Sequence, residues 1–184
     1  MSEQEAKSAL QPGQRSALVW LWLAIIVAVI DLAVKHLAST ELTYGMPVRV
    51  FSFLDWTLLH NTGAAFSFLA EAGGWQRWFF VAVAVVVSGV LLVWLKRTPR
   101  QFWWLGMALA LILGGAVGNL YDRAVHGYVV DYISVHYGGY YFPAFNLADS
   151  AITAGAIILI VDMLFLSGGG EKLPQENEET QESK

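Results

Sequence analysis

The stretch FPAFNLADSAITAGAIILIVDMLF, from Phe142 to Phe165, decides how this chain folds. Most of it is apolar and long enough to cross a bilayer, whose hydrocarbon core needs about 20 residues of helix. Its first turns nevertheless carry Asn146, Asp149 and Ser150. An ionisable group at membrane depth costs about 2.5–3.5 kcal/mol on insertion scales, and it marks a candidate functional site. The sequence therefore predicts a membrane helix whose beginning takes part in chemistry.

The composition of the whole chain also indicates a membrane protein. Of its 184 residues, 56% are hydrophobic and 14% are charged, whereas soluble domains carry about 25% charged residues. The chain contains no Cys, which excludes disulfides, thiolate catalysis and cysteine metal sites. Nothing in the composition suggests nucleic acid as a partner. The polar segments 1–16 and 167–184, the second rich in Glu, are predicted to be disordered.

Four apolar segments are long enough to span a membrane. The predicted helices cover about 17–38, 75–95, 102–120 and 145–166. The loop between the second and the third contains Lys96, Arg97 and Arg100, and short loops rich in Lys and Arg stay in the cytoplasm. This orientation places both termini in the cytoplasm and the two remaining loops on the outer side.

The outer segment 39–74 is more than a linker. It is rich in Val, Phe and Trp, alternates in part between polar and apolar residues, and contains the turn sequence NTG. This pattern predicts two or three short strands that form a small sheet within 39–74, resting on the outer membrane face. The chain is therefore predicted to be a mainly α membrane protein, with a single membrane domain over 17–166. In the second outer segment, Tyr137, Tyr140 and Tyr141 indicate an aromatic patch at the membrane interface.

Polar residues that are unusual for a membrane protein fall at one membrane surface. Asp31 and Lys35 lie four residues apart near the outer end of the first helix, where they share a face and can pair. The other helix ends and the outer loops supply Asn61, Asn119, Asp122, Arg123, Asp131, Asn146 and Asp149. This convergence predicts an assembled polar site at the outer face.

Two carboxylates, Asp131 and Asp149, are the best candidates for catalysis. Asp131 lies in a short strand-like run, and Asp149 lies near a helix N-terminus, where the macrodipole favours negative charge. Two carboxylates within a few ångströms of each other do not both ionise easily, so such a pair shares a proton near neutral pH. The ionised partner activates water, and the protonated partner donates to a carbonyl oxygen or a leaving amine. This is the chemistry of an aspartic peptidase, which needs no metal or other cofactor.

Five motifs, in their order along the chain, resemble the bacterial lipoprotein signal peptidases, also called signal peptidase II. The motifs are DLAVK (31–35), HNTGAAFS (60–67), GGAVGNLYDR (114–123), VVDY (129–132) and FPAFNLADS (142–150). The resemblance covers about residues 31–162. It implies an aspartic endopeptidase of the bacterial inner membrane that cleaves prolipoprotein signal peptides just before a diacylglyceryl-modified cysteine.

The resemblance also implies roles for single residues. Asp131 and Asp149 match the catalytic pair, whereas Tyr132 stands where Phe is frequent. Positions that match site support or substrate binding are Asn61, Gly63, Asn119, Arg123, Asn146, Asp31, Lys35 and Asp122. The fold implied is four transmembrane helices with a small extracytoplasmic β-cradle and an outer helical loop. The implied partners are the lipid-modified prolipoprotein, membrane lipid and a globomycin-type inhibitor, and the chain is expected to be a monomer.

Three other functions remain as alternatives. A small proton-coupled transporter would use Asp131 and Asp149 as a relay, but a relay should run through the membrane rather than stop at one surface. A metallopeptidase would use His126 and His136 with the same carboxylates, although their spacing matches no zinc motif such as H-E-x-x-H. A scaffold without enzymatic activity would leave the clustered carboxylates unexplained.

The site residues also have plain structural interpretations. Asp131 would be a solvated loop carboxylate, and Asp149 would simply begin a helix. Asp31 and Lys35 are more easily explained as a structural ion pair than as a catalytic unit. Arg123 is expected to order its loop or to pair with a carboxylate, either Asp122 or one of the two catalytic candidates.

Overall fold

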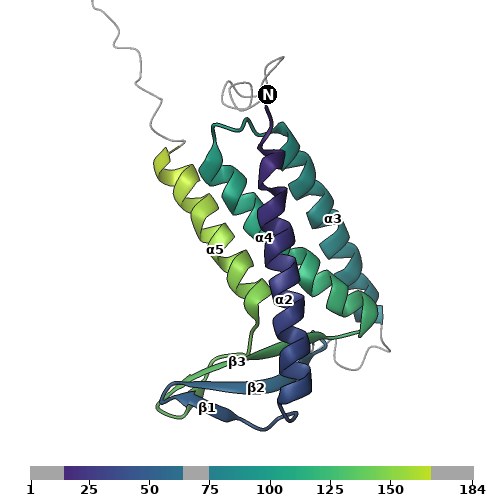
Figure 1. The fold of residues 1–184 in the computed structure, drawn as a ribbon, viewed down its shortest axis with the longest axis vertical. Coiled ribbons are helices and arrows are strands. Elements are labelled where there is room, and N and C mark those ends of the chain that lie inside the picture. Colours follow the sequence, from purple (N-terminus) through teal and green to yellow (C-terminus); the bar gives the residue numbers. More distant parts are fainter. Residues whose placement is uncertain (1–14, 64–74, 167–184) are drawn as a thin grey trace, which may run out of the picture.

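Four long helices and one small sheet make up the fold (Figure 1). The computed structural model describes residues 15–63 and 75–166. The long helices are α2 (Leu21–Glu41), α3 (Trp75–Arg97), α4 (Trp103–Val125) and α5 (Leu147–Val161). A short 3-10 helix, η1 (Ala17–Trp20), precedes α2, and a turn of π-helix, η3 (Asp162–Leu166), follows α5.

Each long helix, extended by its short neighbour where there is one, is long and apolar enough to span a membrane. The candidate spans in the described residues are Ala17–Glu41, Trp75–Arg97, Trp103–Val125 and Leu147–Phe165. Of the 18 most apolar consecutive residues in α4, 56% are buried, whereas the corresponding share in the other three spans is 17–22%. The helix α4 is therefore the centre of the bundle, with α2, α3 and α5 packed around it. The prediction of a four-helix membrane fold is confirmed.

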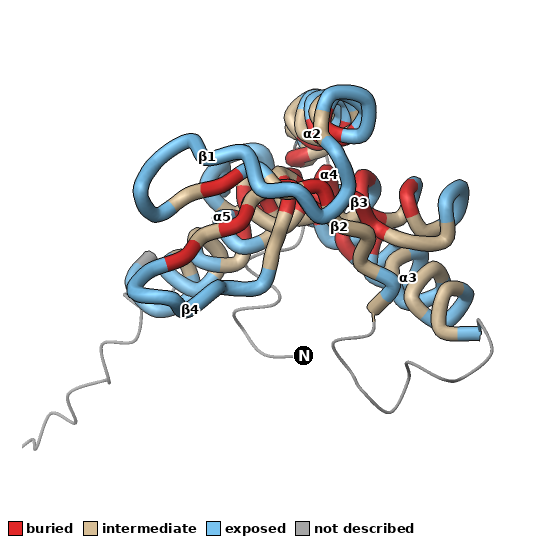
Figure 2. Tube along the Cα trace, turned by 90° about the horizontal axis from the view of Figure 1, so that it is seen from below, coloured by how far each residue is buried: buried red, intermediate tan, exposed pale blue. Residues whose placement is uncertain are grey.

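An antiparallel sheet lies across one end of the bundle, and its strand order is β1-β2-β3-β4 (Figure 2). The strands are β1 (Val48–Phe51), β2 (Leu54–Asn61), β3 (Val129–Tyr137) and β4 (Tyr140–Tyr141). The sheet is thus not confined to 39–74 as predicted, because the second outer segment supplies half of its strands. The sequence of β3 reads as a short strand-like run, but in the structure the strand is nine residues long and pairs with β2.

The sheet is held to the bundle by the last turns of α2. Ala38 of α2 packs against Leu58 of β2 and against Val130 and Tyr132 of β3. Side chains alternate between the two faces of a strand, so the neighbours of these β3 residues point to the opposite face. This alternation sends Asp131 away from α2.

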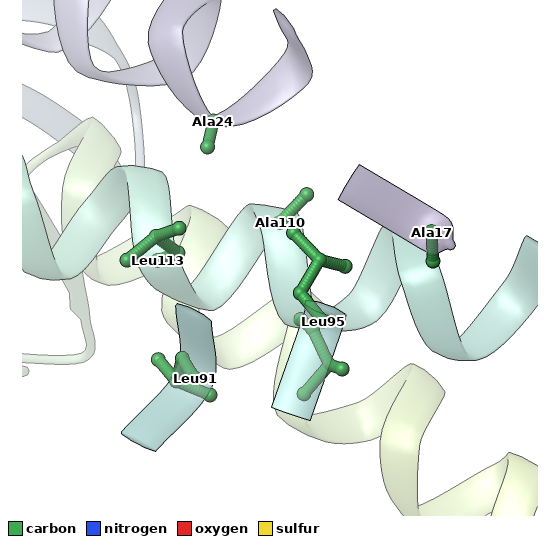
Figure 3. Close-up of a cluster of buried hydrophobic side chains, with 7 residues drawn as sticks. Ala17, Ala24, Leu91, Leu95, Ala110 and Leu113 are labelled. Carbon is green, nitrogen blue, oxygen red and sulfur yellow. The ribbon is translucent and has the colours of Figure 1, made fainter. Parts of the chain in front are cut away.

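An apolar cluster joins η1, α2, α3 and α4 toward the end of the bundle opposite the sheet (Figure 3). Its members are Ala17, Ala24, Leu91, Leu95, Leu109, Ala110 and Leu113. No polar side chain belongs to this cluster. The buried charges of the described chain are instead concentrated at the sheet end.

Several element boundaries differ from the predicted ones. The helix α4 continues to Val125, beyond the predicted end at 120, and α2 reaches Glu41 instead of 38. The predicted bounds followed the apolar runs, but the helical backbone continues past them. In the added turns of α4, the charge of Asp122 is paired with Lys35. The helix α5 begins at Leu147, with Asn146 as its N-cap.

Residues 1–16 and 167–184 were predicted to be disordered. Arg15 and Ser16 are instead ordered: Ser16 forms a bridge with Pro99, and the N–H of Arg100 donates to the carbonyl oxygen of Arg15 at 2.9 Å. The other predictions of disorder and the outer helical loop concern residues outside 15–63 and 75–166.

Glycines let the outer helices approach α4 closely. A side chain at Gly115 would overlap the carbonyl oxygen of Ala148 in α5. A Cβ at Gly114 would lie 2.7 Å from the carbonyl oxygen of Ala24 in α2. Because both obstacles are backbone atoms, no change of rotamer could relieve the overlap. The distance between α4 and the first turn of α5 therefore depends on Gly115.

We predict that Gly115→Ala lowers the free energy of unfolding by about 1–3 kcal/mol, the usual range for overpacking. The added methyl group must push α5 away at Ala148, so activity should fall as well. Thermal unfolding in detergent measures the first effect. Gly89→Ala is the matched control, because a Cβ at Gly89 in α3 meets no atom within 4 Å. Equal stability of the two variants would contradict the packing argument.

Candidate active site

The first turn of α5 places the carboxylate of Asp149. The side chain of Asn146 accepts from the N–H of Asp149 at 2.9 Å, and the carboxylate of Asp149 accepts from the N–H of Asn146 at 3.2 Å. This reciprocal pair is a capping box, which satisfies two backbone donors at a helix start. The helix N-terminus also favours negative charge there. A carboxylate at the mouth of an apolar helix is thus stabilised locally.

Strand β3 carries the second carboxylate, Asp131, which is 2% exposed. The side-chain amide of Asn61, on the neighbouring strand β2, donates to Asp131 Oδ2 at 3.0 Å. The amide oxygen of Asn61 accepts in turn from the N–H of Gly63 at 2.9 Å. Gly63 has φ = +86°, a backbone conformation that favours glycine. The predicted site residues Asn61 and Gly63 therefore act together, as one turn that holds Asp131.

Two asparagines connect the carboxylates of Asp131 and Asp149, which we call the carboxylate pair. Asn146 Nδ2 donates to Asp131 Oδ1 at 2.7 Å, and Asn119 Nδ2 donates to Asp149 Oδ1 at 2.8 Å. Asn146 Nδ2 also lies 3.3 Å from Asn119 Oδ1, within hydrogen-bond distance. The chain therefore brings β3, α4 and α5 together in one polar unit.

Behind this unit lies a buried cation, Lys35, which is 2% exposed. Its Nζ lies 2.8 Å from Asp31 Oδ2 and 3.0 Å from Asp122 Oδ2. The same atom donates to Asn119 Oδ1 at 2.8 Å. Because an ammonium group can only donate, it fixes the amide of Asn119 with its oxygen toward Lys35 and its NH₂ group toward Asp149.

The two aspartates around Lys35 hold backbone as well. Asp31 Oδ1 accepts from the N–H of Ala148 at 2.8 Å, which ties α2 to the first turn of α5. Asp122 Oδ2 accepts from the N–H of Val130 at 3.1 Å, which ties α4 to β3. These three charged residues therefore position both elements that carry the carboxylate pair. Their part is structural support, as expected for the Asp31–Lys35 pair.

Burial raises the pKa of Asp131 from 3.8 to about 6. The nearby charge of Asp149 also raises this pKa, whereas the hydrogen bonds from Asn61 and Asn146 and the charge of Lys35 lower it. The raised pKa lets Asp131 hold a proton close to neutral pH. A carboxyl group of this kind suits general acid–base catalysis.

Arg123 was expected to order its loop or to pair with a carboxylate, and among the described residues it forms no ion pair. Within the described residues, its Nη1 lies 3.4 Å from the carbonyl oxygen of Asn119, and its guanidinium lies 5.3 Å from the ring centre of Phe80. The charge of Arg123 is thus held against an aromatic face beside the site.

Sequence reasoning missed Phe80 and the hydroxyl of Tyr132. A Cβ at Gly63 would come within 2.6 Å of the Phe80 ring, so Phe80 lies between the turn of Gly63 and Arg123. Nothing in the sequence distinguishes Phe80 as a site residue, since it is one apolar residue in an apolar helix. The Tyr132 hydroxyl accepts from the N–H of Leu147 at 3.3 Å, which ties β3 directly to α5. The position of Tyr132 beside Asp131 was the available signal.

The two histidines of the metallopeptidase alternative lie apart from the carboxylate pair. His126 Nδ1 lies 3.6 Å from Asp122 Oδ1, and His136 Nε2 lies 3.1 Å from Asp55 Oδ2. In the described part of the chain, no three His, Asp or Glu side chains are placed to share a metal ion. This arrangement gives the metallopeptidase interpretation no support.

Comparisons with known proteins agree with the site. A model of the family described as signal peptidase (SPase) II matches residues 23–165. The lipoprotein signal peptidase of Pseudomonas putida is 58% identical over 153 residues, which cover 82% of this chain and 90% of that protein. The lipoprotein signal peptidase of Acinetobacter baumannii is 53% identical over 166 residues, which cover 90% of this chain and 94% of that protein.

Solved structures share the fold. A bacterial membrane enzyme structure obtained by the in meso method at 1.9 Å resolution has a TM-score of 0.71 and 31% sequence identity, covering 80% of this chain and 93% of that one. A second, at 2.3 Å, has a TM-score of 0.72 and 29% identity, covering 84% and 93% of the two chains. Fold and relatives together define a peptidase embedded in the membrane. More closely, the chain belongs to the signal peptidase II family, as its five motifs predicted.

We predict that Lys35→Met lowers the free energy of unfolding by about 3–5 kcal/mol, because it leaves Asp31 and Asp122 buried without their cation. Chemical or thermal unfolding in detergent measures the loss. Lys96→Met is the matched control, since Lys96 is exposed at the end of α3 and should change stability by less than about 0.5 kcal/mol. A small effect of Lys35→Met would mean that the charged cluster is dispensable.

Acidification should stabilise the wild type relative to Asp131→Asn. The unfolded chain releases the proton of Asp131 near 3.8, whereas the folded chain holds it up to about 6. Between these values the folded chain binds more protons, so its stability rises as pH falls. From pH 7 to pH 4, the difference in free energy of unfolding between wild type and variant should shift by about 2 kcal/mol in favour of the wild type. A shift in the opposite direction would show that folding lowers this pKa.

Proposed function

We propose that Asp131 and Asp149 are the catalytic residues with which this chain cleaves signal peptides from prolipoproteins, just before the lipid-modified cysteine. The observation that carries the assignment is the junction of Asn146 and Asn119, which holds both carboxylates at one place. One carboxylate comes from the sheet and the other from a helix N-terminus, so each has its own environment. Differing environments are what separates the roles of acid and base.

The reaction requires one shared proton. The ionised carboxylate removes a proton from water, whose oxygen forms a bond with the carbonyl carbon of the scissile peptide. The protonated carboxyl donates its proton to the carbonyl oxygen, which gives a neutral tetrahedral intermediate. When this intermediate collapses, the C–N bond breaks and the leaving nitrogen takes a proton from the carboxyl group that acted as base. A hydroxyl of the intermediate returns its proton to the other carboxylate, which restores the pair. The raised pKa of Asp131 favours Asp131 as the proton carrier at the start.

Arg123, Gly63 and the asparagines have supporting roles in this proposal. Asn61 and Asn146 donate to the proton-carrying carboxyl, and Asn119 donates to its partner. Each donor restricts the rotation of a carboxyl group, so the reacting oxygens stay aimed at the substrate carbonyl. The half-buried guanidinium of Arg123 forms no ion pair among the described residues, so in this proposal it is available to substrate.

We further propose that the sheet and the active site lie at the outer face of the bacterial inner membrane, with both termini in the cytoplasm. Lys96 and Arg97 end α3 at the opposite end of the bundle from the sheet, as the positive-inside rule requires. A lipid-modified substrate would then enter sideways from the bilayer while its scissile bond reaches the carboxylate pair. We propose a monomer as the working unit and a globomycin-type inhibitor as a ligand of the same site.

The transporter alternative has no support. Within the described residues, the buried charged groups all lie at the sheet end of the bundle. The cluster toward the opposite end consists of apolar side chains. A proton relay needs polar groups on both sides of the membrane.

We predict that Asp131→Asn and Asp149→Asn each reduce cleavage of a diacylglyceryl-modified prolipoprotein peptide by at least about 100-fold, since neither amide can take up or give the proton. The assay is carried out in detergent with EDTA present, and thermal unfolding shows that the variants fold. Asp55→Asn is the matched control, because Asp55 is an equally buried carboxylate of the sheet that contacts His136 instead of the pair. Full activity of either pair variant would remove that residue from the mechanism.

A further inference from the structure

The free end of the sheet carries a large exposed aromatic surface. We call this end the sheet tip, defined as 50–53, around the turn from β1 to β2, and 137–142, around the turn from β3 to β4. Tyr137 and Tyr140 are each 85% exposed. The other exposed large side chains of the tip are Val50, Phe51, Phe53, Tyr141 and Phe142. Figure 2 shows that exposed residues predominate along β1 and β4, the two edges of the sheet.

Charged side chains are almost absent from this part of the surface. In the segments 48–61 and 129–146, the Asp, Glu, Lys and Arg residues are Arg49, Asp55 and Asp131. Asp55 and Asp131 are buried, so the exposed charge is the cation of Arg49. Arg49 Nε lies 3.8 Å from Asp55 Oδ1, but the Arg49 side chain remains 73% exposed. Sheet edges that face water are usually protected by charged residues or proline. β1 carries the single exposed charge of Arg49 and β4 carries none, so these two edges have fewer charges than strands that face bulk water usually have.

The position of the tip explains this composition. The sheet lies across the ends of the membrane spans, and its tip projects sideways beyond the bundle, beside the beginning of α5 (Figure 1). The exposed face of α5 is apolar and faces lipid, with Ile157 and Ile160 more than half exposed. The tip lies beside the beginning of the same helix and therefore extends over the bilayer.

We propose that the sheet tip is embedded in the headgroup layer of the adjacent leaflet. Aromatic rings with a polar end, such as Tyr137, Tyr140 and Tyr141, prefer this layer. The guanidinium of Arg49 is placed to contact lipid phosphate, for which arginine geometry is well suited. The occupant of the exposed surface is therefore phospholipid headgroup, which also covers the unpaired edges of β1 and β4.

Anchoring of the tip fixes the depth of the site. The tip strands β2 and β3 lead directly to Asn61 and Asp131 at their other ends. A sheet that is held at its tip by lipid and at its base by α2 has no freedom to tilt relative to the membrane. The level of Asp131 below the membrane surface is then set by two contacts far from the chemistry.

The absence of cysteine in the chain makes a direct test possible. Tyr140→Cys introduces a single thiol for a spin label at an exposed turn, and Phe53→Cys labels the neighbouring turn as a second position. Glu41→Cys, at the exposed end of α2, is the control in water. The full chain is reconstituted in vesicles of equal parts phosphatidylethanolamine and phosphatidylglycerol without substrate. Collision with oxygen, which concentrates in lipid, is compared with collision with a water-soluble nickel chelate.

The proposal expects the ratio of collisions with oxygen to collisions with the nickel chelate to be clearly higher for the labels at 140 and 53 than for the label at 41. If both tip labels resemble the control, the tip lies in water and the proposal is wrong. If the tip spectra instead show dipolar broadening that disappears on dilution of the protein in lipid, a second copy of the chain covers the tip. That result would also overturn the proposal.

Discussion

The ammonium group of Lys35 is the contact on which the rest of the structure depends. It compensates two buried aspartates, and these aspartates bind the backbone of α5 and β3. Its third hydrogen bond turns the amide of Asn119 toward Asp149. One buried charge thereby determines where two elements lie and which way a side chain of the site points. Such a charge is tolerated at membrane depth because every one of its donors has a partner.

The beginning of α5 is hydrogen-bonded to β3, to α2 and to its own N-cap residue. Its first backbone N–H groups donate to the hydroxyl of Tyr132 on β3, to Asp31 on α2 and to the side chain of Asn146. A helix normally leaves such groups to water or to a local cap. Here two of the partners come from other elements, so the first turn cannot shift without breaking contacts to both. This constraint gives the carboxylate pair a fixed geometry before any substrate arrives.

Much of this arrangement was predictable from the sequence, for identifiable physical reasons. Membrane spans are visible because lipid demands long apolar runs, and the polar site is visible because Asp31, Asp122 and Asp149 interrupt those runs. The contribution of β3 to the sheet was not predictable, since its pairing with β2 joins segments about seventy positions apart. The contacts of Arg123 and Phe80 were also hidden, because an aromatic ring in an apolar helix gives no signal of the charge it faces.

The sheet joins two segments that are synthesised far apart, and this has a consequence for the order of assembly. Asp131 is held by Asn61 from the first outer segment and by Asn146 from the last connection. A nascent chain that has inserted only two or three helices lacks the cap of α5 and one of the carboxylates. A partly made molecule therefore has no complete site with which to cut its neighbours in the membrane. In the proposed mechanism, hydrolysis therefore begins only after the final helix has inserted, so completion of the fold protects neighbouring proteins from cleavage.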